Sequence, residues 1–184
     1  MKKIVTMLLA AALLTGCAAQ IPSGIDPAFH ASGAADLGML GHWKSARGTE
    51  VVITHMGGAA FEMDVTDGST SAVYRGHLLA VGGARFAEVS VFQPEGSREI
   101  PVYVYALVEL TGDSMVHKPL RAEWLAQESS RLPGAIYHST AQEQPGSGGV
   151  VVRDRGAMLE LLRKAASDPA AFGPGETLQR VHAK

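Results

Sequence analysis

The alternation of apolar and polar residues between about positions 40 and 120 constrains the fold of this 184-residue chain more than any other feature. Apolar side chains at every second position give a strand one face for a hydrophobic core and one face for water. Turn residues such as Asp67-Gly68 and Gly112-Asp113 separate the rows. The pattern predicts about seven strands at the spacing of an antiparallel barrel or sandwich. The clearest rows are Phe61, Met63 and Val65; Ala87, Val89 and Val91; and Val102, Val104, Ala106, Val108 and Leu110.

Beyond residue 120 the spacing of apolar residues becomes helical. Residues 120–129 are expected to form a short helix. Asp154 can cap a second helix, because four apolar residues after it fall on one stripe of an amphipathic helix. Asp168-Pro169 predicts the start of one further helical turn, and residues 177–182 are expected to form a last strand. The stripe consists of Met158, Leu161, Leu162 and Ala165.

These patterns together predict a mainly β fold with added helices. We expect an antiparallel meander that forms a barrel, with the amphipathic helix near the C-terminus. Residues 38–184 are expected to form one domain, since about 147 residues is an ordinary single-domain length. The single cysteine excludes an intramolecular disulfide. A formal charge of −2, from 16 basic and 18 acidic residues, argues against a nucleic-acid binder.

Residues 1–16 have the order of a secretory signal peptide. Two lysines precede an uncharged run at residues 4–14. A helix of about 11 residues spans roughly 16 Å, whereas a bilayer core is about 30 Å thick. The run is therefore too short for an ordinary membrane span and is typical of an export signal. Residues 17–37 are rich in Ala, Gly, Ser and Pro and show no sustained period, which predicts a flexible tether.

Leu14-Thr15-Gly16-Cys17 resembles the bacterial lipobox, in which small residues precede an obligatory cysteine. The resemblance implies that Cys17 receives a diacylglycerol thioether, that a signal peptidase cuts before it, and that the new amine is acylated. Two or three acyl chains hold a protein stably at a membrane, whereas one chain holds it only marginally. Ala18 stands where, by the same analogy, an aspartate would favour the inner membrane, so we expect the outer membrane, facing the periplasm. The alternative is that Cys17 is an ordinary residue of a conventional signal peptide.

Gly41-His42-Trp43, at the start of the first strand of the body, is similar to the G-x-W signature of lipocalin-like calycins. The resemblance implies a barrel whose narrow end is closed by Trp43, with an arginine near the last strand packed on the tryptophan. Arg180 lies in the right part of the chain for that role. The alternative is that Trp43 is an ordinary core aromatic at a strand start. The whole layout also resembles uncharacterised small bacterial lipoproteins, which implies no activity.

Gly112-Asp113-Ser114, with His117 three residues later, resembles the block that opens one family of serine hydrolases. In that family the block stands near the mature N-terminus and is completed by D-x-x-H near the C-terminus, whereas Asp168 here is followed by Pro-Ala-Ala. Gly and Asp also suit a hairpin turn, because both tolerate positive φ. We therefore expect no catalytic residue. A hydrolase that uses Ser114 and His117 stays as an alternative.

The seven histidines show no spacing typical of a metal site, such as H-x-x-x-H. We therefore expect neither a metal nor a cofactor. The alternation places His77 with Arg75 on the polar face of a strand, which indicates a solvated histidine. Tyr103 and Tyr105 lie opposite the aliphatic row of their strand, and the sequence leaves open whether they face the surface, a helix or a pocket.

The sequence as a whole favours a lipid-anchored protein of the cell envelope that is not an enzyme. We expect a binding or interaction module for an apolar small molecule or another envelope component, held at the membrane through Cys17. A small serine hydrolase and a purely structural envelope protein are the alternatives. A hollow apolar barrel would favour ligand binding over a structural role.

Overall fold

The computed structural model describes residues 20–22, 37–91, 102–131, 135–139, 148–152 and 155–182. Cys17, the predicted signal peptide and most of the predicted tether lie outside the described residues, and so does Asp154.

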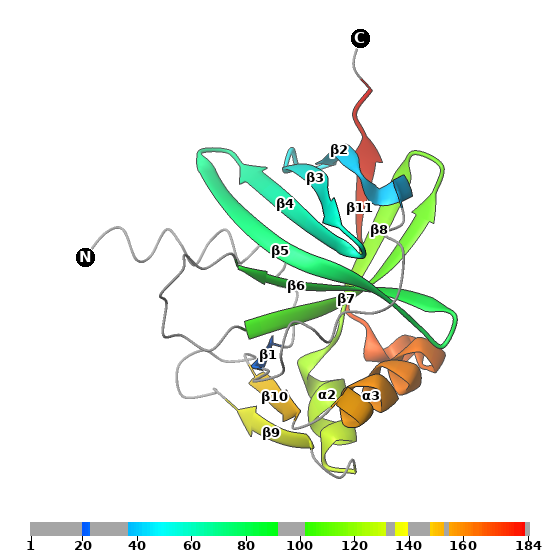
Figure 1. Ribbon diagram of the computed structural model, residues 1–184. Coiled ribbons are helices and arrows are strands. Elements are labelled where there is room, and N and C mark those ends of the chain that lie inside the picture. Colours follow the sequence, from blue (N-terminus) through cyan, green and yellow to red (C-terminus); the bar gives the residue numbers. More distant parts are fainter. Residues whose placement is uncertain are drawn as a thin grey trace, which may run out of the picture.

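Eight strands form a closed antiparallel barrel (Figure 1). Seven of them follow one another as a meander, and the last strand closes the barrel by pairing with β8 on one side and β2 on the other. The predicted antiparallel meander with a calycin-like barrel is therefore confirmed. The strands of the barrel are β2 (Gly41–Ser45), β3 (Glu50–Gly57), β4 (Ala60–Asp67), β5 (Thr70–Val81), β6 (Ala84–Val91), β7 (Val102–Thr111), β8 (Ser114–Pro119) and β11 (Glu176–Arg180).

The apolar phase of each strand faces the inside of the barrel. Because side chains alternate along a strand, a register slip of one residue would turn every apolar side chain outward, so the buried interior fixes the register. The hairpin turns follow the sequence signals, since Gly68 and Gly112 both have φ of +57°. We call the buried residues inside the barrel the barrel core. They are Met39, Trp43, Val51, Ile53, Phe61, Leu78, Ala87, Val89, Val108, Met115 and Leu178.

Gly76 makes room inside the barrel for its most buried phenylalanine. A Cβ atom on Gly76 would lie 2.7 Å from Cζ of Phe61 and closer still to the carbonyl oxygen of Glu88. Both contacts are too short for any side chain, so the glycine is required here by packing. Phe61 is only 2% exposed as a result.

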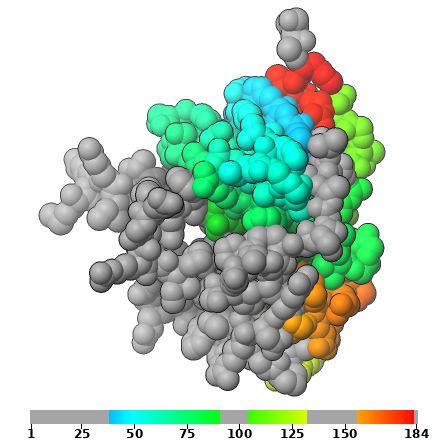
Figure 2. Space-filling model, in the orientation of Figure 1, coloured from blue at the N-terminus to red at the C-terminus, as the bar shows by residue number. Residues whose placement is uncertain are grey.

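One end of the barrel is closed by the 3₁₀-helix η3 (Leu37–Met39) together with Trp43. The buried Trp43 indole N–H donates to the carbonyl oxygen of Met39 at 2.8 Å. The Arg180 guanidinium lies over the Trp43 ring, 4.2 Å from its centroid, and donates to the carbonyl oxygens of Gly38 and Leu40. This is the contact that the calycin resemblance implies. In the space-filling view, β2 (blue) and the C-terminal residues (red) accordingly lie side by side (Figure 2).

The closed end of the barrel also requires a glycine at position 41. Its φ of +121° is a conformation that side chains other than glycine rarely adopt. A Cβ atom there would also lie 2.8 Å from the Nη1 atom of Arg180. The glycine and the tryptophan of the Gly-His-Trp motif therefore serve one structure, the arginine-backed closure of the barrel.

Two helices, α2 (Ala122–Ser129) and α3 (Arg155–Ser167), pack against the outside of the barrel wall (Figure 1). Both were predicted. Asp168 joins them, because its carboxylate accepts from the Trp124 indole at 2.7 Å and from the backbone N–H of Ala170, which caps the 3₁₀-helix η4 (Pro169–Ala171). The predicted stripe of α3 is buried: Met158, Leu161, Leu162 and Ala165 are all 0–1% exposed.

Three short strands extend the sheet beyond the barrel. They are β1 (Gln20–Pro22), β9 (Ala135–Ser139) and β10 (Gly148–Val152). β1 pairs antiparallel with β7 and parallel with β10, which pairs antiparallel with β9. The alternation did not predict β9, and β1 lies within the segment whose composition predicted a tether. Such short strands form because β7 offers them an unpaired edge, which is information that the local sequence does not carry.

Candidate functional site

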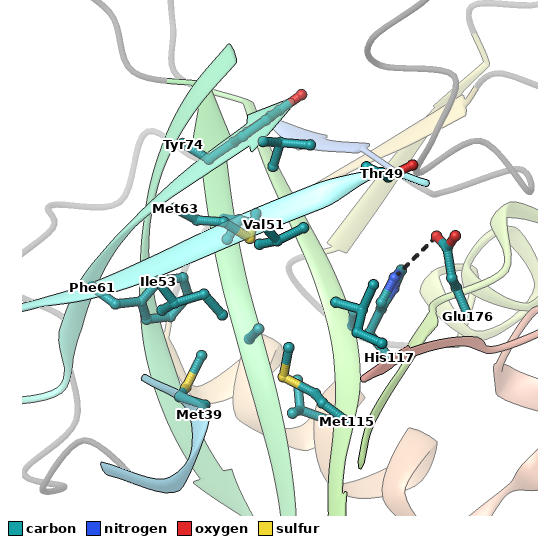
Figure 3. A pocket seen from close by; sticks show the side chains of 16 residues that line it. Met39, Thr49, Val51, Ile53, Phe61, Met63, Tyr74, Met115, His117 and Glu176 are labelled. Carbon is teal, nitrogen blue, oxygen red and sulfur yellow. Dashed lines mark ion pairs between the residues drawn. The ribbon is translucent and has the colours of Figure 1, made fainter. Parts of the chain in front are cut away.

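The barrel encloses a cavity of about 90 Å³ (Figure 3). Aliphatic side chains, Phe61 and three methionines make up most of its wall, and the methionines are Met39, Met63 and Met115. A cavity of this size exceeds the 10–15 Å³ or so that a single water needs, yet water also needs polar partners that an apolar wall does not provide. The interior therefore holds a mostly apolar cavity rather than a fully packed core.

Three polar side chains that line the cavity, Thr49, His117 and Glu176, gather away from the closure by Trp43, and Tyr74 lies apart from them (Figure 3). We define the rim cluster as Arg47, Thr49, His117 and Glu176. Figure 3 shows Thr49, His117 and Glu176 on one side of the cavity and Met39 on the other, with Met115 near His117. His117 and Glu176 are direct partners in the pairing of β8 with β11. The cluster thus joins three separate parts of the chain.

The turn between β2 and β3 positions two members of the rim cluster. The Ser45 hydroxyl accepts from the backbone N–H groups of Arg47 and Thr49, each at 3.2 Å. The backbone N–H of Ser45 donates to the carbonyl oxygen of Thr49 at 2.9 Å, and Gly48 supplies the positive φ that the turn requires. This bonding fixes the turn, so that Arg47 reaches Glu176 and Thr49 lies against the cavity.

Glu176 is held by two cationic or hydrogen-bonding neighbours. The Arg47 guanidinium donates to Oε1 at 2.8 Å, and His117 Nε2 lies 3.4 Å from Oε2. The hydrogen bonds from His117 and then Arg47 lower the pKa of Glu176 to about 2, although partial burial acts in the opposite direction. Glu176 is therefore ionised at neutral pH, and both of its oxygens are occupied.

Two buried polar atoms of the rim cluster have no hydrogen-bond partner within the described part of the chain. They are the hydroxyl oxygen of Thr49 and Nδ1 of His117. Thr49 is only 4% exposed, so its side chain is buried from the solvent around the protein. An unsatisfied buried polar group costs about 1–3 kcal/mol, and one in a native structure calls for an explanation.

Replacing Glu176 with glutamine is expected to lower the free energy of unfolding at pH 7 by about 1.5–3 kcal/mol, the contribution of hydrogen bonds to a charged group. Because the folded-state pKa of about 2 lies below the ordinary value of 4.5, this stabilisation is complete above about pH 4.5 and is lost as the pH falls through 2. Urea denaturation of both proteins at pH 7 and pH 2.5 should show the difference shrinking at the lower pH.

The matched control for this prediction is Glu50→Gln, because Glu50 pairs with Lys44 on the exposed surface. Exposed ion pairs are screened by water, so this variant should stay close to the parent protein. Equal losses for the two variants, or a Glu176→Gln loss that does not depend on pH, would contradict the description of Glu176 as a held rim carboxylate.

Ser114 and His117 are not brought together. Side chains three positions apart on a strand point to opposite faces, so His117 faces the cavity with Met115 while Ser114 faces outward. The Ser114 hydroxyl lies 3.4 Å from Nε2 of Gln179. Asp113 instead forms ion pairs with Arg180 and His182 near the closed end of the barrel. The Gly112-Asp113-Ser114 block is thus a hairpin turn.

A second polar cluster lies on the outer face of β5, β6 and β7. Tyr105 donates its hydroxyl proton to Glu88, and His77 Nδ1 lies 4.0 Å from the same carboxylate. Burial raises the pKa of Glu88, which is 5% exposed. The prediction of a solvated His77 is therefore wrong, because its side chain is only 21% exposed. Tyr105 faces the helices, and the side chain of Tyr103 lies outside the described residues.

The sequence pointed to His117 only in the hydrolase alternative, and it did not point to Arg47, Thr49 or Glu176. A signal was present for two of them, since His117 follows Met115 by two residues and Glu176 precedes Leu178 by two. Both are polar residues in the inward phase of a strand. Among the described residues, no three His, Cys, Asp or Glu side chains group as metal ligands, and no helix has the length and hydropathy of a membrane span.

No protein-family model matches this sequence, and neither a curated protein nor a solved structure matches the chain.

Proposed function

We propose that this chain is a lipid-anchored envelope protein whose barrel binds a small apolar molecule without catalysing a reaction on it. The observation that supports the proposal is the mostly apolar cavity of about 90 Å³ inside the closed barrel. Ligand sites are typically concave and mostly apolar, with few polar groups. An engineered cavity of about 150 Å³ binds benzene, so a ligand for the resting cavity is a small one.

The three methionines of the wall widen the range of ligands. Methionine has a flexible, unbranched side chain that adapts to different shapes, and it is common at binding surfaces that accept several partners. Met39, Met63 and Met115 all line the cavity. A change of their rotamers would enlarge the space for a ligand without moving the strands.

The anchor in this proposal is Cys17. Its support is the Leu-Thr-Gly-Cys sequence after a basic and then apolar start. Cleavage before Cys17 would remove Lys2 and Lys3, so 14 basic against 18 acidic residues would give the mature chain a charge of −4. Anionic lipids would not attract such a protein, and the acyl chains alone would hold it at the membrane. Ala18 favours the outer membrane by analogy with other lipoproteins.

Ligand binding is tested by titrating the full chain carrying Cys17→Ala with cyclopentane. The Cys17→Ala chain cannot be lipidated at residue 17, so it needs no detergent, which would compete with the barrel for cyclopentane. With ¹³C-labelled methionine methyl groups, we expect saturable NMR shifts at Met63 and Met115. Met56 is half exposed on β3 and Met158 packs under the helices, so both are internal controls. Shifts at all four, or at none, would contradict binding in the cavity and favour a purely structural protein.

The anchor is tested by growing cells that express the chain with labelled palmitate. Label should enter the parent protein and be absent from Cys17→Ala. Labelling that persists in the variant would contradict lipidation of Cys17. An unlabelled parent protein would also contradict it and would favour the alternative that Cys17 is an ordinary residue of a conventional signal peptide.

A further inference from the structure

The cavity has a polar end and an apolar end, and this asymmetry bears on the ligand. The apolar end lies toward Met39, next to the closure, and the polar end is formed by the rim cluster (Figure 3). A purely hydrocarbon ligand would leave the Thr49 hydroxyl and Nδ1 of His117 without partners. A ligand with a hydrogen-bonding group at the rim would satisfy them.

The hydrogen-bonding roles at the rim follow from the contacts of Glu176. His117 Nε2 faces the ionised carboxylate at 3.4 Å, so Nε2 carries a proton. In the neutral ring Nδ1 is then an acceptor, and in the charged ring it is a donor. The Thr49 hydroxyl donates or accepts. An alcohol hydroxyl complements both atoms in either state of the ring, because it too both donates and accepts.

The charges at the rim disfavour an ionised head group. A carboxylate would lie beside the carboxylate of Glu176, and an ammonium would have to compete with Arg47 and His117 for the oxygens of Glu176. Either ion would also lose its hydration on entering the apolar cavity, and this desolvation is costly without a free counter-charge. The charge balance therefore selects an uncharged polar group.

We infer that the barrel binds a small alcohol-type amphiphile, with its uncharged hydroxyl between Thr49 and His117 and its apolar part toward Met39. This inference rests on the proposed binding function and specifies its ligand class. Thr49 is the better residue to test it, because Glu176 and its partners hold the barrel end together. Thr49→Val keeps the shape of the side chain and the backbone bonds to Ser45 while removing the hydroxyl.

The experiment compares cyclopentanol with cyclopentane on the parent chain, Thr49→Val and the conservative variant Thr49→Ser, all in the Cys17→Ala full chain. Affinity is read from the methyl shifts of Met63 and Met115. Thr49→Val should weaken cyclopentanol binding roughly tenfold and leave cyclopentane binding unchanged, since one hydrogen bond contributes about that much. Thr49→Ser should restore most of the loss. Cyclopentylamine and cyclopentanecarboxylate should bind at least about tenfold more weakly than cyclopentanol.

The outcomes separate the inference from the function on which it rests. If no probe moves the methyl signals, the cavity does not bind small molecules and both proposals fail. If cyclopentane and cyclopentanol bind but respond equally to Thr49→Val, binding stands and the alcohol class is wrong. Tighter binding of the carboxylate or the amine than of cyclopentanol would also overturn the inference.

Discussion

Replacing Trp43 with alanine is expected to lower the free energy of unfolding by about 3–5 kcal/mol, as for other buried tryptophans. The indole is fully buried in the barrel core, and three contacts depend on it. It packs in the core, its N–H donates to Met39, and its ring supports the Arg180 guanidinium. Native domains are stable by only about 5–15 kcal/mol, so urea denaturation should be carried out at low temperature.

The control for this prediction is Trp43→Phe, which keeps an aromatic ring but loses the hydrogen bond to Met39. Its loss should be clearly smaller. A double-mutant cycle that combines Trp43→Ala with Arg180→Ala should give a coupling free energy of about 0.5–2 kcal/mol between the two side chains. This is the range of a cation–π contact that is partly shielded from water. A Trp43→Ala loss below about 1 kcal/mol, or no coupling with Arg180, would contradict the closure described here.

Replacing Ala106 with leucine is expected to abolish cyclopentane binding while the barrel still folds. Ala106 is buried on β7 and lines the cavity, so the added isopropyl group would occupy the space of the ligand. We expect the affinity to fall by more than about tenfold, or about 1.4 kcal/mol. The stability should change by less than about 1.5 kcal/mol, because the new group fills an existing cavity. Calorimetric titration and urea denaturation measure the two effects.

The matched control is the same substitution away from the cavity, Ala80→Leu, since Ala80 is an exposed residue of β5 that does not line the cavity. It should leave the affinity for cyclopentane unchanged. Retained binding in Ala106→Leu would place the ligand outside the cavity. Loss of binding in both variants would show that the barrel does not tolerate larger side chains and would contradict the cavity as the binding site.

The sequence predicted the elements that depend on local pattern. The alternation gives the strands from β2 to β8 and the inward direction of Phe61 and Met63, because burial of one strand face is a local property. The helical spacing likewise gives α3 with its buried stripe. The turn at Asp67-Gly68 followed from residue chemistry alone. These features account for most of the barrel and for the helices.

The sequence did not predict the rim cluster, because its members meet only through tertiary pairing. Arg47 and Thr49 lie in the first turn of the barrel, whereas His117 and Glu176 lie about sixty residues apart on paired strands. Their contact depends on β11 lying between β8 and β2, which no local pattern specifies. Because His117 is in the inward phase of its strand, the sequence shows only that it is an unusual core residue. Its pairing with Glu176 becomes visible only when β11 is known to be the partner strand.

Two of the strands outside the barrel, β1 and β9, were missed for a related reason. β9 and β10 pair with each other, and β10 reaches β7 through β1. Five-residue and three-residue strands carry too few side chains to show an alternation. Their formation depends on the edge that β7 presents, which exists only after the barrel has formed.

The proposed function requires that the barrel encloses a dry apolar cavity that small molecules can enter. The direct measurement is a crystal structure of the Cys17→Ala full chain under xenon pressure, because xenon enters dry apolar cavities of this kind. We predict a xenon atom inside the barrel, bordered by Met63, Val89 and Met115. A barrel interior without xenon, filled by side chains or by ordered water, would contradict the claim.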